Sequence, residues 1–389
     1  MADCMQEWPE PVVRVQALAE SGLDSIPRCY VKPPCDRPAP AADDDDDASS
    51  GASIPVVDLG NGSDDEGGQL AEAVAVACRG WGFFQVVNHG VRPELMRAAR
   101  EAWHGFFRLP LQEKQKYANS PRTYEGYGSR LGVEKGAILD WGDYYFLVLS
   151  PDAAKSPAKY WPANPGICKE VSEEYGREVI KLCERLMRLL SASLGLDETR
   201  FQEAFGGADC GAGLRANYYP RCPQPDLTLG LSAHSDPGIL TVLLADDHVR
   251  GLQVRRRDGH WVTVQPLPDA FIVNVGDQIE ELISSCTLCM NGNSWTDDVQ
   301  ILSNSMYKSV EHRVIVNAEE ERISLALFYN PRGDVPVAPA PELVTPERPS
   351  LYYPPMTFDE YRVYVRKNGP KGKAQLEALK GQSITEKKE

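Results

Sequence analysis

A short run of the sequence, LSAHSDPGILTVLL at residues 231–244, places a histidine and an aspartate two residues apart at the start of an apolar segment. If this segment is a strand, the side chains at i and i+2 point to the same face, so His234 and Asp236 could hold one metal ion between them. The pair alone is a weak signal, because the same two residues are also typical of a capped turn. A third ligand has to come from elsewhere in the chain.

His312 is the candidate third ligand among the six histidines of the chain. It lies in YKSVEHRVIV, a strongly β-forming run that we expect in the same sheet region as His234 and Asp236. Two histidines and one carboxylate on one face of an octahedral ion are the ligand set of non-haem Fe(II) oxygenases, and they leave three coordination positions open. The three residues therefore predict a metal site that can bind substrates directly.

A buried anion site is predicted by RISLALFYN, in which Arg322 and Ser324 again stand at i and i+2. We expect this run to be the strand after the one that carries His312. An unpaired arginine inside a sheet is costly, and no Asp or Glu in the strands around it looks placed to pair with it. A ligand carboxylate is the economical partner, held by two bonds from the guanidinium and one from the hydroxyl.

The elements that must position these residues change in type along the chain. Apolar residues recur at helical spacing over 70–80, 93–106 and, most extensively, 167–196. From residue 214 onward, short β-forming runs are separated by Gly, Pro and Asp. The predicted strands are 54–59, 81–90, 214–219, 238–244, 252–255, 261–265, 271–275, 307–316 and 322–329.

This order of elements predicts an α+β fold, with a double-stranded β-helix (jelly-roll) core braced by the N-terminal helices. A last helix is expected over 357–367, with Thr357 as its N-cap. Such helices need a sheet or each other to cover their apolar faces.

Composition and charge exclude several classes of protein. The net charge is −15 and there is no Lys/Arg-rich cluster, which speaks against a nucleic-acid partner. No secretory leader and no run of eighteen apolar residues is found, and ten scattered cysteines do not form a disulfide scaffold. We therefore expect no membrane partner, and a monomer in the cytoplasm, with the nucleus as a second compartment.

Three motifs, HSD, SVEHRVIV and RIS, together resemble those of the Fe(II)/2-oxoglutarate-dependent dioxygenases of plants. The runs IPVVDL, WGFFQVVNHGV and NYYPRCPQP are similar to the N-terminal and central signatures of the same family. The resemblance covers nearly the whole chain outside an acidic linker and the last residues. It implies an oxidoreductase that uses Fe(II), 2-oxoglutarate and O2, with ascorbate as a supporting reductant.

Carried over residue by residue, the resemblance assigns roles to the candidates above. His234, Asp236 and His312 match the iron ligands. Arg322 and Ser324 match the pair that grips the distal carboxylate of 2-oxoglutarate. Two further contacts of this cosubstrate are implied in the run RANYYP, where they are Asn217 and Tyr219.

A second group of basic residues bears on the substrate. Arg215 lies two residues before Asn217, so if this segment is a strand, its side chain faces the same cosubstrate cavity. Arg362 and Arg366 stand four apart in FDEYRVYVRKNG, on one face of the last helix. If that helix closes over the mouth of the barrel, three guanidinium groups converge beside the iron. Alternatively, the two helical arginines pair with surface carboxylates such as Glu360, or favour the helix C-terminus.

Two long runs, SPRTYEGYGSRLGVEKGAILDWGDYYFL and PPMTFDEYRVYVRKNGPKGK, are similar to the jasmonate-induced oxygenases, which hydroxylate jasmonic acid and so inactivate the hormone. The resemblance implies that the three arginines bind the carboxylate of this small organic acid. Tyr145 and Phe146 would flank its apolar tail, although aromatic residues at this spacing are also typical of a core. A flavonoid dioxygenase of the anthocyanidin synthase or flavonol synthase type is the alternative, but a neutral flavonoid would leave the arginines unpaired.

The resemblance divides the chain into five regions and exposes one departure. The regions are an N-terminal extension at 1–53 ending in a disordered acidic linker (32–53), an N-terminal dioxygenase region at 54–165, a bracing helix at 166–212, the jelly-roll core at 213–335, and a C-terminal helix and tail at 336–389.

Relatives run directly from GDQI into QILSN, whereas here EELISSCTLCMNGNSWTDDV, residues 280–299, intervenes. Its composition predicts a loop, yet it interrupts a strand next to a metal ligand. A catalytically impaired splice or gene-model variant, or a non-catalytic acid sensor, stays open as an alternative.

Overall fold

The computed structural model describes residues 7–38, 53–60, 67–279, 307–336 and 356–373 of the chain. The acidic run at 43–47 and the inserted segment 280–299 lie outside these residues, so the predictions made for them stay predictions, as does the division into five regions. Within the described ranges, no helix combines the length and the apolar character needed to cross a bilayer.

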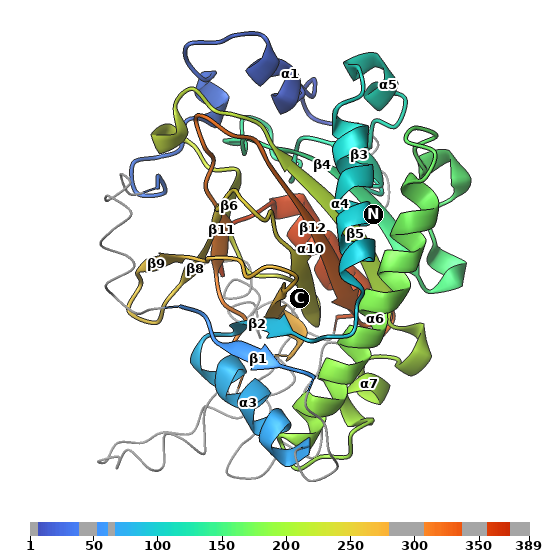
Figure 1. The fold of residues 1–389 in the computed structure, drawn as a ribbon. Helices are drawn as coiled ribbons and strands as arrows, with labels where there is room; N and C mark the ends of the chain where they lie inside the picture. Colours follow the sequence, from blue (N-terminus) through green and yellow to red (C-terminus); the bar gives the residue numbers. More distant parts are fainter. Residues whose placement is uncertain (1–6, 39–52, 61–66, 280–306, 337–355, 374–389) are drawn as a thin grey trace, which may run out of the picture.

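Two sheets form the centre of the molecule (Figure 1). The strands of the larger sheet, in spatial order, are β1 (Val56–Asp58), β2 (Phe83–Val87), β10 (Phe271–Val275), β7 (Leu240–Leu244), β12 (Arg322–Asn330), β5 (Gly211–Tyr219), β4 (Asp143–Ser150) and β3 (Gly126–Gly128). Those of the smaller sheet are β6 (Leu231–His234), β11 (His312–Val314), β8 (Leu252–Arg255) and β9 (Trp261–Thr263). Every pairing is antiparallel except that of β1 with β2.

The chain crosses repeatedly between the two sheets. From β5 onward it passes from the larger sheet to the smaller one and back, so that β5, β7, β10 and β12 share one sheet while β6, β8, β9 and β11 share the other. This alternation is the arrangement of a jelly roll. The predicted α+β fold with a jelly-roll core is confirmed.

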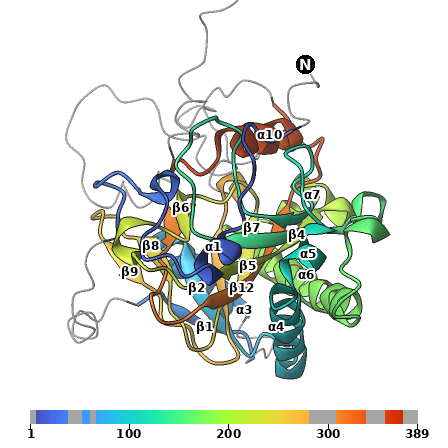
Figure 2. The same ribbon diagram turned by 90° about the horizontal axis from the view of Figure 1, so that it is seen from above.

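Helices from the N-terminal half cover one side of the larger sheet (Figures 1 and 2). They are α3 (Gly67–Gly80), α4 (Pro93–Phe107), α6 (Cys168–Ala192) and α7 (Arg200–Ala204). Two short helices, α1 (Val15–Glu20) and α5 (Leu111–Gln115), complete the N-terminal part. α4 and α6 contact each other and β12, and α3 contacts α6. The long stripe predicted over 167–196 is the buried face of α6, where Val171, Tyr175, Val179 and Leu186 recur at helical spacing.

The last helix, α10 (Phe358–Asn368), lies apart from the bracing helices, as Figure 2 shows from above. It begins at Thr357, whose hydroxyl accepts a hydrogen bond from the backbone N–H of Glu360, while the Glu360 carboxylate accepts one from the backbone N–H of Thr357. This reciprocal pair is a capping box, and it confirms the predicted N-cap. Phe358 and Tyr361 are the buried residues that dock α10 onto the rest of the protein.

Candidate active site

His234, Asp236 and His312 converge at one point between the two sheets, each offering a ligand atom within 4.8 Å of the others. The Nε2 atom of His234 lies 3.6 Å from Oδ1 of Asp236, and the Nε2 atom of His312 lies 3.7 Å from Oδ2. The two histidines stand directly opposite each other in the antiparallel pair of β6 and β11. The three residues singled out from the sequence are thus brought together.

The reason for this convergence differs from the one predicted. His234 is the last residue of β6, and Asp236 lies in the connection that leads from the smaller sheet to β7 in the larger one. The two side chains therefore meet because the chain crosses between sheets there, and not because both alternate along one strand. The connection passes so close to the backbone after β10 that a Cβ at Gly276 would lie 2.2 Å from the carbonyl oxygen of Gly238.

Backbone carbonyl groups orient both imidazole rings. Nδ1 of His234 lies 2.9 Å from the carbonyl oxygen of Ser232, and Nδ1 of His312 lies 3.2 Å from that of Val310. Because a carbonyl oxygen can only accept, each Nδ1 carries a proton, which leaves Nε2, directed toward Asp236, as the nitrogen that can bind a metal. Burial, with His312 nearby, lowers the pKa of His234 to about 4, so this ring is neutral at physiological pH.

The Asp236 carboxylate is held from its far side. Its Oδ2 atom accepts hydrogen bonds from the Thr241 hydroxyl at 2.6 Å and from the Asn274 amide at 2.9 Å. Burial alone would raise the pKa of Asp236, but the two histidines and these two donors outweigh it and lower the pKa below its usual value. Two imidazole nitrogens and one carboxylate are a donor set that fits Fe(II).

A buried cationic face lies on the neighbouring strands. In the pairing of β12 with β5, Arg322 stands opposite Tyr219 and Ser324 stands opposite Asn217, and all four residues are buried. Among the described residues, neither Nε nor Nη1 of Arg322 has a hydrogen-bond partner. Burial lowers the pKa of this guanidinium below its ordinary value, although the nearby Tyr219 hydroxyl and Asp246 carboxylate act in the opposite direction. A buried cation that forms no ion pair in the described structure and has donors left over is what the site of an anionic ligand requires, so the residues fit the carboxylate of 2-oxoglutarate.

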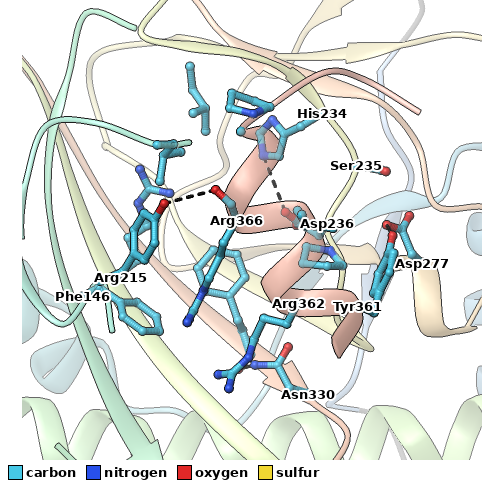
Figure 3. Close-up of a pocket in the computed structure, with 18 of the residues that line it drawn as sticks. Phe146, Arg215, His234, Ser235, Asp236, Asp277, Asn330, Tyr361, Arg362 and Arg366 are labelled. Atoms are coloured by element: carbon cyan, nitrogen blue, oxygen red, sulfur yellow. Dashed lines mark hydrogen bonds and ion pairs between the residues drawn. The ribbon is translucent and has the colours of Figure 1, made fainter. Parts of the chain in front are cut away.

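A cavity of about 180 Å³ is lined by His234 and Asp236 together with residues of α10, and Arg215 and Phe146 lie across from this helix (Figure 3). Its wall carries the three predicted arginines, Arg215, Arg362 and Arg366. The remaining lining is largely apolar and aromatic, and includes Phe146, Phe328 and Val365. The arrangement suits a small ligand with one anionic end and one apolar end.

The three arginines differ in how they are satisfied. Arg362 pairs at 2.7 Å with Asp359, a surface carboxylate of the kind that the alternative expected, while the carboxylate of Glu360, the example named, is engaged in the capping box. Arg366 forms no ion pair in the described part of the chain, and its guanidinium carbon lies 5.4 Å from the Tyr124 ring centroid. Burial, with Arg362 nearby, lowers the pKa of Arg366 to about 10, which leaves it charged.

Arg215 lies in β5, two residues before Asn217 and on the same face, as predicted. Its guanidinium carbon lies 4.1 Å above the Tyr144 ring centroid, and its Nε atom has no hydrogen-bond partner among the described residues. The arginine is therefore held by stacking, with donors left for a ligand.

The structure places the two predicted aromatic residues on opposite faces of β4, so only Phe146 can contact a ligand in the cavity. Phe146 lines the cavity, but Tyr145 is fully buried on the opposite face of β4, where its ring packs against Trp103 and Phe106. Successive side chains of a strand point to opposite faces, so Tyr144, and not Tyr145, shares the cavity with Phe146. Tyr144 was missed because the sequence does not give the phase of β4.

Comparison with known proteins agrees with this geometry. Residues 210–331 match the 2OG-Fe(II) oxygenase superfamily, and residues 54–164 match the non-haem dioxygenase in morphine synthesis N-terminal family. Jasmonate-induced oxygenase 2 of Arabidopsis thaliana is 56% identical over 96% of this chain and 94% of its own length. Flavonol synthase 1 of Crocosmia x crocosmiiflora is 37% identical over 88% of this chain and 94% of its own.

Among solved structures, the crystal structure of JOX2 in complex with 2OG, Fe and JA matches with a TM-score of 0.83 and 55% identity, over 96% of this chain and 99% of that one. The resemblance inferred from the sequence motifs is confirmed. The chain is an Fe(II)- and 2-oxoglutarate-dependent dioxygenase of the 2OG-Fe(II) oxygenase superfamily, and within it belongs to the jasmonate-induced oxygenases.

Proposed function

We propose that this protein hydroxylates jasmonic acid and thereby inactivates the hormone. The observation that carries the proposal is Arg366, a charged guanidinium without an ion-pair partner in the described structure, on the wall of a cavity that also borders His234 and Asp236. A substrate with one carboxylate and an apolar body satisfies both the arginine and the apolar lining. The names of the relatives and the JA-bound JOX2 structure support this choice of acid.

We assign His234, Asp236 and His312 as the iron ligands. When bound, iron and 2-oxoglutarate supply the oxidising chemistry, in which O2 and 2-oxoglutarate yield succinate, carbon dioxide and one oxygen atom for a substrate C–H bond. The protein holds the two Nε2 atoms and the Asp236 carboxylate ready through Nδ1–carbonyl bonds and the Thr241 and Asn274 donors. This preorganisation leaves the side of the site that faces the cavity free for substrates.

The buried pairs of β12 and β5 would anchor 2-oxoglutarate. Arg322 offers a fork of two N–H groups and Ser324 offers a hydroxyl, which together match one carboxylate. Asn217 and Tyr219, directly opposite them, would orient the rest of the cosubstrate. Because these four residues lie on two paired strands, they would hold the cosubstrate carboxylate against a rigid part of the fold.

The three arginines would set the orientation of the acid. Arg366 and Arg215 bind its carboxylate, with Arg362 shared between the ligand and Asp359. Phe146, Phe328 and Val365 then guide the apolar tail and exclude water from the reacting carbon. Fixing the charged end in this way holds one stretch of the tail near the metal, which is the positional contribution the protein makes to the rate.

The test compares three substrates with the full-length protein, Fe(II), ascorbate and 2-oxoglutarate. We expect hydroxylated product and succinate with jasmonic acid. Methyl jasmonate should be about 30- to 100-fold poorer, because two charge-assisted bonds to the carboxylate are weakened. Turnover of a dihydroflavonol in place of the acid would favour the flavonoid dioxygenase. Acid binding without succinate release would indicate a non-catalytic sensor or an impaired variant.

The cellular setting stays a prediction. We expect a monomer in the cytoplasm, with the nucleus as a second compartment and no nucleic-acid partner, on the basis of the acidic composition and the lack of a basic cluster in the sequence. Gel filtration and a fluorescent fusion test these expectations.

A further inference from the structure

We propose that Tyr361 is a positioning residue, which couples the acid-binding helix α10 to the iron site through a hydrogen bond to Asp277. The inference deepens the proposed function, on which it rests for the identity of the acid. It concerns how the substrate is held relative to the metal, and not which groups contact either one.

The link begins in a buried hydrogen bond. The Tyr361 hydroxyl donates to Oδ2 of Asp277 at 2.7 Å, and the two residues are only 3% and 2% exposed (Figure 3). Water does not compete for such a bond, and a charged or strongly polar acceptor makes it stronger than a surface one. The backbone N–H of Asp277 in turn donates to the carbonyl oxygen of Asp236 at 2.8 Å. Two bonds thus connect α10 to one proposed iron ligand.

The chain after α10 is fastened to the other two ligand segments. The backbone N–H of Gly372 donates to the carbonyl oxygen of Ala233 at 2.8 Å, and that of Lys373 donates to Oε1 of Glu311 at 2.9 Å. Ala233 and Glu311 are the residues directly before the two ligand histidines. A Cβ at Gly372 would lie 2.3 Å from the Glu311 carboxylate, so this contact depends on glycine.

Helix α10 is therefore attached at both ends to the segments that carry the metal ligands. At its N-terminal end, the backbone N–H groups of Phe358 and Asp359 also fasten the first turn to the segment after β12. The Tyr361 side-chain bond is what ties this turn to the iron site, directly before Arg362 and five residues before Arg366. Without this bond that end of α10 would be held mainly by the segment after β12, so both guanidinium groups would shift relative to His234. The acid would then be held at the wrong distance for its C–H bond to react.

Poor positioning has a chemical signature in this class of reaction. If the C–H bond is out of reach, 2-oxoglutarate and O2 still give succinate and carbon dioxide. The second oxygen atom is then reduced to water by two electrons and two protons from the ascorbate in the assay. Succinate is formed without an equal amount of hydroxylated acid, and the ratio of the two products measures the positioning directly.

The experiment compares Tyr361→Phe with Tyr364→Phe. Both variants remove one hydroxyl from α10, but the Tyr364 hydroxyl bonds no residue in the described ranges, so it is a matched control. Hydrogen–deuterium exchange of the peptides covering α10 and Asp277 is measured on the protein alone. Steady-state kinetics with jasmonic acid and the ratio of succinate to hydroxylated product are measured on the iron-loaded enzyme.

For Tyr361→Phe we expect exchange about tenfold faster in α10 and at the Asp277 amide, the effect of losing one buried bond to a carboxylate. The KM for jasmonic acid should rise about three- to tenfold, more than kcat falls, and the product ratio should rise at least about twofold. Tyr364→Phe should match the wild type in all of these.

Two results would overturn the coupling: equal exchange in the two variants, or faster exchange in Tyr361→Phe with the KM for jasmonic acid and the product ratio unchanged. Because the exchange measurement uses no substrate, it tests the coupling even if the wild-type protein does not accept jasmonic acid. Failure of the proposed function would appear as the absence of product from the wild type, which is a separate outcome.

Discussion

Replacing Arg322 by methionine should raise the stability of the ligand-free protein while abolishing its use of 2-oxoglutarate. Arg322 is 4% exposed, forms no ion pair in the described structure, and has two nitrogen atoms without hydrogen-bond partners there. Exchange of buried ionic groups for apolar ones of similar volume is often stabilising by about 1–4 kcal/mol. Taking about 2 kcal/mol, and about 2 cal/mol/K per residue over about 300 ordered residues, the unfolding temperature should rise by about 3 °C.

The effect on the cosubstrate should be opposite and larger. Each hydrogen bond to a charged partner contributes about 1.5–3 kcal/mol, so loss of the guanidinium fork removes about 4 kcal/mol of binding, close to a thousandfold in Kd. Thermal unfolding with and without saturating 2-oxoglutarate measures both effects, because a ligand that binds only the folded state raises its stability. Without ligand, the wild type should unfold at a lower temperature than Arg322→Met. Addition of 2-oxoglutarate should raise the unfolding temperature of the wild type and leave that of Arg322→Met unchanged.

Arg313→Met is the matched control for this argument. Arg313 is equally buried, at 4%, but its Nε donates to Gln253 at 2.8 Å and its guanidinium carbon lies 4.3 Å from the Trp261 ring centroid. Its removal should therefore destabilise the protein and leave 2-oxoglutarate binding intact. If Arg322→Met were less stable than the wild type without ligand, the interactions of Arg322 with Tyr219 and Asp246 would outweigh the cost of burying its charge, and the reasoning would be refuted.

Three further expectations concern the same cavity. Arg366→Leu should raise the KM for jasmonic acid about tenfold or more. Arg362→Leu should raise this KM less, because Arg362 already pairs with Asp359. Steady-state kinetics that gave the larger KM for Arg362→Leu would contradict the assignment. Asp236→Ala should lose divalent metal binding and all turnover, and wild-type activity of this variant in excess iron would falsify the triad. The folded-state pKa of His234 lies near 4 against about 6.5 in the unfolded chain, so the unfolded state binds the extra proton between these values and stability is lost as pH falls through them. Urea unfolding of the metal-free protein from pH 7 to pH 4 should therefore show the wild type losing about 3 kcal/mol more than His234→Gln, and parallel curves would show that His234 is not buried neutral.

Apolar periodicity together with the turn residues that bound each run predicted several elements of the fold. The stripe over 167–196 became α6, and the runs at 252–255 and 271–275 became β8 and β10 with the predicted bounds. β4 was not predicted, because DYYFLVLS is a nearly continuous apolar run whose first three residues are all buried. Such a run has no period, so the sequence pattern does not distinguish a strand covered on both faces from a buried helix.

The candidate site could be predicted where chemistry alone singles out a residue. An arginine inside an apolar strand has few explanations, and a histidine–aspartate pair with a distant histidine has a recognisable ligand chemistry. The sequence does not determine which face of a strand a given residue occupies or which strands pair. A shift of one residue along β4 decides whether Tyr144 or Tyr145 faces the cavity. Asp277 was missed because its role depends on a contact with Tyr361, 84 residues away in sequence, and nothing local to either residue indicates it.

The distribution of charge explains why this protein binds acids in spite of its own acidity. A net charge of −15 repels anions, but salt screens that repulsion at distances beyond about 8–10 Å. Arg322, buried in β12, and Arg366, on the wall of the cavity, act in a less screened environment where attraction to a carboxylate is stronger. Recognition must then depend on full desolvation of the ligand carboxylate against these guanidinium groups, and not on attraction from solution. A ligand whose carboxylate is blocked leaves a guanidinium group buried without an anionic partner. The free-energy cost of that unpaired charge, which also destabilises the ligand-free enzyme, is therefore what lets the site select free acids.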